Sequence, residues 1–262
     1  MTKTIPRARP RKALSILLAI LASSLVVLMA PALASAATYT VDSTGDQADQ
    51  NPGTDGCKTA VNTCTLRAAI EEANDSTGVA DEVAFAAAFN GQLADTITLG
   101  SGLPAIESEL EIDGVSAGPC MTAAGVNGPC AGVSGPAADS AFSIEGENVT
   151  VIGLSLTAAE AAVEADAAVS AVVNANWIGT KLDGSAAVNE VGVAALGGGT
   201  IEIADNQIRG GDAPALDIID SEADIDGNTI DGGQNGVRVE GENSIGTVIS
   251  GNTIENADAA GV

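Results

Sequence analysis

The sequence predicts an all-β fold, a parallel β-helix whose short strands stack as a solenoid behind a short amphipathic capping helix. The first observation is a repeated frame, in which an asparagine follows an apolar residue by three positions and precedes an isoleucine by two. The asparagines that centre this frame are Asn176, Asn206, Asn228 and Asn252. Their spacings of 30, 22 and 24 residues are typical of stacked repeats, because one repeat of this size cannot bury its own apolar face.

The second observation is an alternating segment near the end of each repeat. In Gly236–Glu240 the two valines alternate with Arg238 and Glu240, which predicts a strand with the valines inside and the charged residues outside. Earlier repeats carry comparable apolar residues at Val163, Val193, Leu216 and Ile218. Two or three short strands per repeat, with no helical segment between them, favour a β-helix over a leucine-rich or helical repeat. One repeat earlier Leu154 takes the asparagine position, so five repeats align.

Residues 1–36 indicate an exported chain. Five basic residues within the first twelve positions precede an apolar run, Ala13–Ala30, and the small-residue end Ala34-Ser-Ala36. This order is that of a secretory signal peptide, cleaved after Ala36 or, as a second choice, after Ala34. A retained membrane anchor is the alternative, since the run has 18 residues. We expect a secreted, extracellular or cell-surface protein that is free of the membrane once the signal is removed.

The exported part is strongly acidic. Removal of residues 1–36 leaves five basic and 35 acidic residues, a net charge of −30. Such a charge disfavours nucleic acid and anionic membranes as partners and favours cations, although solubility alone is the simpler reason for it. Apolar residues make up 45% of the chain and recur regularly, so we expect a folded protein despite the charge.

All four cysteines lie in the exported part, where an oxidising compartment favours disulfides. Three pairings are possible, and short loops favour Cys57 with Cys64 and Cys120 with Cys130. Metal ligation by these residues is disfavoured, because the chain has no histidine and neither pair has two-residue spacing.

Residues 37–80 are expected to cap the solenoid. They open on a strand-like segment, Thr38–Val41, and reach an amphipathic helix with Thr65 as its N-cap. The helix includes Arg67, and its apolar face carries Leu66, Ala69, Ile70 and Ala73 at helical spacing. A helix at this point would cover the first coil and prevent edge-to-edge pairing.

Residues 81–262 are expected to hold the repeats. Short strands are predicted at 96–99 and 110–113, followed by an irregular loop rich in Gly, Pro and Ala at about 115–139. The longest repeat is expected to bulge outward at 181–189. The sequence stops inside a repeat, ten residues after Asn252, which predicts truncation at the C-terminus because solenoids need a terminal cap.

The start of the predicted helix carries a family resemblance. Cys64-Thr-Leu-Arg-Ala-Ala-Ile70 resembles the Cys-Ser-Leu-Arg-Glu-Ala-Ile motif that names the CSLREA domain of exported bacterial β-helix proteins, and segments 95–99, 103–114 and 176–193 strengthen the match. The resemblance implies a right-handed, pectin-lyase-like β-helix. Thr65 and Ala68 replace the motif's Ser and Glu, which keeps the N-cap hydroxyl and removes the return bond of a capping box.

Two sets of polar residues are interpreted from their stacking. The asparagine column is expected to be structural, with amides hydrogen-bonded from coil to coil at about 4.8 Å spacing. A candidate calcium site consists of carboxylates on neighbouring coils, which repel one another without a cation. Its residues are Glu202, Asp224 and Asp226. No other cofactor is expected.

A third set mixes charges. Arg209, Asp231 and Glu255 each follow their asparagine by three positions and should form one outward column. Surface ion pairing explains this column more simply than a primitive catalytic site does.

The expected function is a structural or adhesin-like surface-interaction scaffold, with no catalytic residue assigned and with extracellular polysaccharide or another surface protein as candidate partner. The first alternative is a polysaccharide lyase or glycoside hydrolase that uses an outward face with Arg209 and Arg238. Only five aromatic residues are present to provide sugar platforms. The second alternative is a calcium-stabilised adhesive module.

Overall fold

The computed structural model describes residues 1–2, 35–54, 56–76, 78–115, 118, 120–166 and 170–262. The chain divides into two units, Met1–Ala34 and Ser35–Val262, and every helix and strand named below belongs to the second. The predicted signal peptide lies outside the described residues except at its ends. Within the described ranges, no helix is long and apolar enough to cross a membrane.

The unit is mostly β, in three parallel sheets that we call sheets A, B and C. Sheet A consists of β1 (Thr38–Val41), β2 (Asp81–Phe85), β4 (Leu110–Asp113), β9 (Val149–Ile152), β12 (Ser170–Asn174), β15 (Thr200–Ala204), β18 (Glu222–Asp226) and β21 (Val248–Ser250). Sheet B consists of β3 (Thr96–Thr98), β7 (Ala131–Ser134), β10 (Leu154–Thr157), β13 (Trp177–Ile178), β16 (Gln207–Gly210), β19 (Thr229–Gly232) and β22 (Thr253–Glu255). Sheet C consists of β8 (Phe142–Ile144), β11 (Ala161–Asp166), β14 (Val191–Leu196), β17 (Leu216–Ile219) and β20 (Val237–Glu240).

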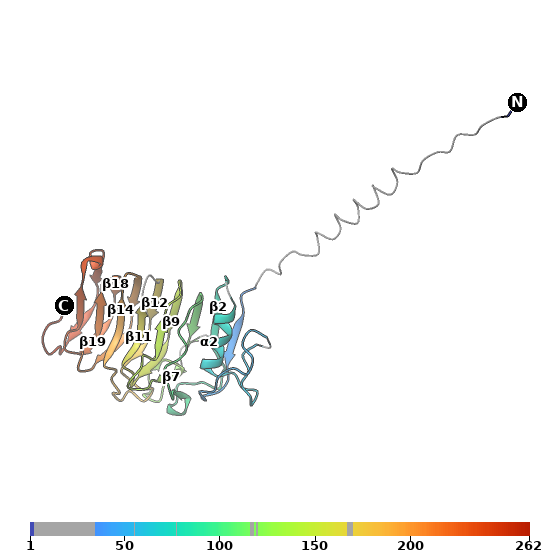
Figure 1. Ribbon diagram of the computed structural model, residues 1–262. Coiled ribbons are helices and arrows are strands. Elements are labelled where there is room, and N and C mark those ends of the chain that lie inside the picture. Colours follow the sequence, from blue (N-terminus) through green and yellow to red (C-terminus); the bar gives the residue numbers. More distant parts are fainter. Residues whose placement is uncertain (3–34, 55, 77, 116–117, 119, 167–169) are drawn as a thin grey trace. The chain divides into compact units, whose positions relative to one another are not determined.

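From β9 onward the chain visits sheets A, B and C in rotation, and we call one visit to each sheet a circuit. Each visit adds a strand in parallel beside the strand of the circuit before. Equivalent residues face each other in register: Ile203 with Ile225 in sheet A, Ile208 with Ile230 in sheet B, and Leu216 with Val237 in sheet C. Figure 1 shows the strands of successive circuits side by side, from β9 to β18.

Apolar side chains of all three sheets point into one core. In sheet A the inward column includes Val151, Val173, Ile203 and Ile225, each 0% exposed. Burial of each such side chain contributes about 1.5–3 kcal/mol, which is why the alternation of apolar and polar residues decides the face of every strand. The strand predicted near the end of each repeat is confirmed, as β11, β14, β17 and β20 of sheet C.

The capping helix is confirmed as α2 (Leu66–Asp75). Its apolar residues Leu66, Ala69, Ile70 and Ala73 are buried in the same core as the sheets. The helix contacts β1 and β2, the first two strands of sheet A, and Figure 1 shows it beside β2. The strands predicted at Thr38–Val41 and at 110–113 are confirmed, and the one predicted at 96–99 spans Thr96–Thr98.

Two predicted irregular segments are more ordered than expected. Within 115–139 the chain forms an antiparallel hairpin, β5 (Cys120–Met121) with β6 (Asn127–Gly128), and then β7, a strand inside sheet B. The sequence hides β7 because Gly132 interrupts its alternation. A larger residue would be tightly packed there, since a Cβ would lie 3.0 Å from Oγ1 of Thr96.

The segment 181–189 does form a loop between β13 and β14, but its last residue is anchored. Asn189 is 2% exposed. Its Oδ1 accepts from the backbone N–H of Ala159 at 2.9 Å, and its Nδ2 donates to the carbonyl of Leu156 at 3.1 Å. This buried asparagine therefore fastens the loop to the preceding circuit. Short 3₁₀ turns, Leu93–Asp95 and Glu242–Ser244, complete the described elements.

Candidate functional site

The four framed asparagines lie in one column where the chain passes from sheet A to sheet B. In each step, the backbone N–H of one asparagine donates to Oδ1 of the asparagine in the next circuit, and so does its side-chain Nδ2. The backbone distances are 2.9 Å for Asn176 to Asn206, 3.0 Å for Asn206 to Asn228 and 2.8 Å for Asn228 to Asn252. The side-chain distances are 3.1, 3.0 and 2.9 Å. Leu154 begins the column, since its N–H donates to Oδ1 of Asn176.

The side-chain amides of this column are hydrogen-bonded to other parts of the fold. Each Nδ2 also donates to a backbone carbonyl of an earlier circuit, at 2.8 Å from Asn206 to Val173 for example. Asn176, Asn206 and Asn228 are at most 1% exposed. A ligand therefore cannot reach them, and their hydrogen bonds join neighbouring circuits.

The residue before each asparagine makes the corner possible. Its φ is positive in every circuit: 54° at Ala175, 55° at Asp205, 68° at Gly227 and 65° at Gly251. Glycine adopts this left-handed conformation without steric cost. The Gly-Asn pairs at 227 and 251 were therefore a signal for the turn, beyond the asparagine itself.

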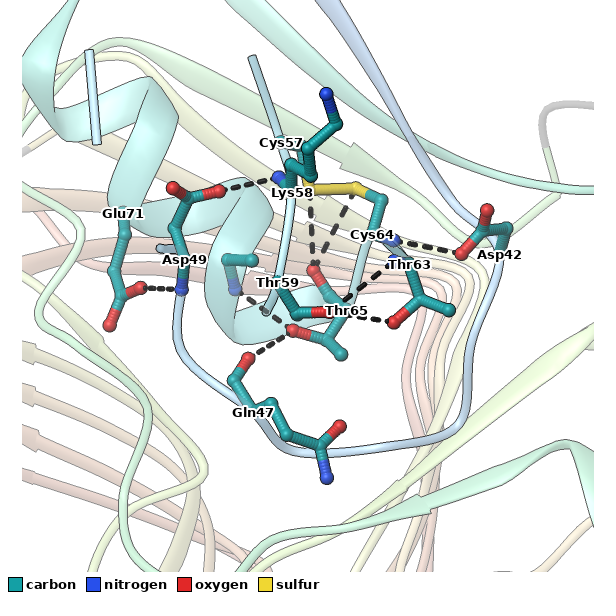
Figure 2. The surroundings of a disulfide bond; sticks show 11 residues. Asp42, Gln47, Asp49, Cys57, Lys58, Thr59, Thr63, Cys64, Thr65 and Glu71 are labelled. Carbon is teal, nitrogen blue, oxygen red and sulfur yellow. Dashed lines mark hydrogen bonds between the residues drawn. A yellow bond between two sulfur atoms is a disulfide. The ribbon is translucent and has the colours of Figure 1, made fainter. Parts of the chain in front are cut away.

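Carboxylates and a disulfide hold the loop before α2 (Figure 2). The backbone N–H of Asp49 donates to Glu71 at 2.6 Å, and Asp49 accepts from the N–H of Lys58 at 2.5 Å. Asp42 accepts from the N–H of Cys64 at 2.8 Å. These acidic residues satisfy backbone donors of the cap, which gives them a structural role.

Both predicted cysteine pairs are confirmed. Cys57 bonds to Cys64 and Cys120 to Cys130, with Cα–Cα distances of 5.2 and 5.1 Å. Disulfides are characteristic of oxidising compartments, so they suggest a location outside the cytosol.

Thr65 begins α2 as predicted. Its Oγ1 accepts from the N–H of Ala68 at 3.1 Å and donates to the carbonyl of Gln47 at 2.5 Å. We expect Thr65→Ala to lower the free energy of unfolding by about 1–2 kcal/mol, because a buried cap hydroxyl is lost. Urea unfolding followed by circular dichroism measures this. Thr65→Ser is the matched control and should remain within about 0.5 kcal/mol of the wild type; an equal loss in both variants would contradict the cap role.

The three candidate calcium ligands do not gather. Glu202 and Asp224 are in register on β15 and β18, where they line a groove of about 390 Å³ on the outer face of sheet A. Asp226 lies two residues further along β18, which is roughly 6–7 Å along a strand. It accepts from the hydroxyl of Ser250 at 2.6 Å. Among the described residues, no three His, Cys, Asp or Glu side chains are grouped to hold a metal ion.

Two arginines form salt bridges with carboxylates, and neither pair is evident from the sequence. On sheet C, Arg238 donates through Nε and Nη2 to Asp217, at 2.6 and 2.5 Å. The hydrogen bond to Asp217 raises the pKa of Arg238 further, so this guanidinium stays protonated and is unsuited to act as a base. In the cap, Arg67 donates in the same way to Asp46, at 2.9 and 3.0 Å.

The mixed-charge column is in register, but its ion pairing was wrongly predicted. Arg209, Asp231 and Glu255 face one another on β16, β19 and β22. In the described part of the chain, the salt bridges are those of Arg67 and Arg238. Asp231 instead accepts from Nδ2 of Asn256 at 2.7 Å. Arg209 also lies on a different sheet from Arg238, so the two arginines do not share one catalytic face.

Comparison of the chain with protein-family models, with curated proteins and with solved structures finds no match.

Proposed function

We propose that residues 37–262 form an exported, right-handed parallel β-helix that serves as a structural or surface-interaction scaffold. The rotation of the chain through three parallel sheets supports the β-helix, because each circuit returns one strand further along every sheet. Crossovers between parallel strands of one sheet are right-handed in nearly all proteins, which supports the handedness. The predicted signal peptide and the two disulfides support export.

The resemblance to CSLREA-domain proteins belongs to the same proposal. Its motif coincides with the start of α2, whose apolar face packs on the first strands of sheet A. Ala68 stands where the motif has glutamate and is 0% exposed, so a buried alanine occupies this helix position in place of a capping carboxylate.

One observation carries the scaffold role: the framed asparagines and two of the three arginines of the described unit are bound to other parts of the fold. The asparagine amides are hydrogen-bonded between circuits, and Arg67 and Arg238 are each held by a carboxylate. A lyase of this fold would need a base beside its substrate, and Arg238 is protonated and paired on the outer face of sheet C. This weakens the enzymatic alternative relative to the scaffold.

Purified residues 37–262 should release no product from a panel of acidic and neutral polysaccharides. Absorbance of unsaturated ends reports lyase activity, and a reducing-end assay reports hydrolysis, each with and without calcium. Cosedimentation with the same polysaccharides measures binding, and retention without turnover would support the surface-interaction role. Turnover that is lost in Arg238→Gln would overturn the scaffold proposal in favour of an enzyme. A saturable calcium titration, abolished in Glu202→Gln with Asp224→Asn, would favour the calcium-stabilised module.

A further inference from the structure

Arg209 differs from the other two arginines of the described unit. Arg67 and Arg238 each direct two nitrogens at one carboxylate. Arg209 donates through Nη1 to the carbonyl of Gly184 at 3.3 Å, and no described carboxylate lies within ion-pair distance of it, although Asp231 is its neighbour on β19. A guanidinium can form a bidentate pair with a carboxylate through two of its nitrogens. Arg209 can still form such a pair with a ligand.

Arg209 lines a pocket of about 280 Å³ formed by sheet B, the β5–β6 hairpin and the loop after β13, which contributes Thr180 and Gly184. The sheet contributes Trp177, Gln207, Arg209, Thr229 and Asp231, and the hairpin contributes Ala124 and Val126. Gln207 faces Thr229 and Arg209 faces Asp231 in register, on strands about 4.8 Å apart. A cationic and an anionic side chain thus line the sheet side of the pocket, and apolar side chains line its hairpin side.

The hairpin wall is held in place independently of any ligand. The Cys120–Cys130 disulfide closes its base. The N–H groups of Ala123 and Ala124 donate to the carbonyls of Gly91 and Leu182, at 2.8 and 3.0 Å. Its Gly128 packs on Trp177 so closely that a Cβ would lie 2.5 Å from the indole ring. A preformed wall reduces the entropy lost on binding.

The charges of the pocket select the ligand. A carboxylate would pair with Arg209, which forms no salt bridge with Asp231. Oδ1 of Asp231 accepts from Nδ2 of Asn256 at 2.7 Å, so an ammonium group a few ångströms away would pair with Oδ2 of Asp231. The exported chain carries a net charge of −30, which repels simple anions from a distance but exerts no net force on a zwitterion. Exposed Val126 and Ala124 provide apolar contact for a short aliphatic group.

We propose that this pocket binds a small zwitterion of the α-amino acid type, with its carboxylate on Arg209, its ammonium group on Asp231 and its side chain against the hairpin. The proposal goes beyond the scaffold role and does not depend on it.

Trp177 makes the test specific, because it is the single tryptophan of the chain and lines the pocket. Titration with L-leucine should change its fluorescence saturably, with a dissociation constant of about 1 mM or tighter. Ligand-observed NMR provides a second readout. N-acetylleucine lacks the ammonium group and leucinamide lacks the carboxylate, so each should bind about tenfold or more weakly.

Substitutions then assign the two charges. Arg209→Gln should weaken the binding of leucine about tenfold and affect the binding of leucinamide less, because leucinamide has no carboxylate. Asp231→Asn should weaken the binding of leucine about tenfold and affect the binding of N-acetylleucine less, because N-acetylleucine has no ammonium group. Glu255→Gln is the matched control, because it is the next residue of the same column and lies outside the pocket. Circular dichroism confirms that each variant is folded. The proposal is overturned if leucine gives no saturable signal in either readout or if glucuronate binds more tightly than leucine. It is also overturned if Glu255→Gln weakens the binding of leucine as much as Asp231→Asn does.

Discussion

Asn206→Ala should lower the free energy of unfolding by roughly 2–5 kcal/mol, the largest effect that we expect from a single polar residue of this chain. The substitution removes the acceptor of the Asn176 N–H and the donor to the Val173 carbonyl. Asn206 is 1% exposed, so water cannot replace either partner. Each buried group that loses its hydrogen bond costs about 1–3 kcal/mol.

Urea unfolding, followed by far-ultraviolet circular dichroism, measures the loss as a change in midpoint at constant slope. Asn206→Leu tests the chemistry, because leucine occupies this position naturally at Leu154. It should restore apolar contact and still destabilise, since the N–H of Asn176 remains without its acceptor. The exposed Asn243→Ala is the control and should change stability by less than about 0.5 kcal/mol. Equal losses in Asn206→Ala and Asn243→Ala would show that the column does not hold the circuits together.

Ile70→Ala should destabilise the unit by about 2–5 kcal/mol, because the side chain is 0% exposed and belongs to the shared core. The helix also covers the beginning of sheet A through its contacts with β1 and β2. A loosened helix would uncover apolar surface and strand edges, which favour association between chains. We therefore expect a lower midpoint in urea and earlier light scattering on heating.

Asp75→Ala is the matched control for this effect, since Asp75 is exposed and ends the same helix. It should leave both measurements near those of the wild type. If Ile70→Ala scatters no earlier than Asp75→Ala while losing the same stability as other core substitutions, α2 contributes packing but does not protect the sheets from association.

The local features of the fold were readable from the sequence. Strands of sheet C follow from alternation at Val237 and Val239, and α2 follows from helical spacing after a threonine cap. The disulfides follow from short loops between the cysteines. In each case the residues that decide the structure lie within about a dozen positions, so the local periodicities of strand and helix suffice.

The candidate site depended on contacts across circuits. Arg238 meets Asp217, 21 positions earlier, whereas Arg209 donates to the Gly184 carbonyl, 25 positions earlier. Asp231 accepts from Asn256, 25 positions later, and forms no salt bridge with Arg209. Adjacent strands place Arg238 beside Asp217 and Arg209 beside Asp231 in the same way, and only the first pair forms a salt bridge.

The sequence by itself therefore determined the repeat, the inward faces and the covalent links of this protein. The tertiary structure decided which charges pair and that a hairpin within the expected loop lines a pocket over sheet B. The physical reason is that the apolar pattern specifies which face of a strand is buried. The orientation of a polar side chain on the outer face is selected by neighbours that stacking brings from distant positions in the chain.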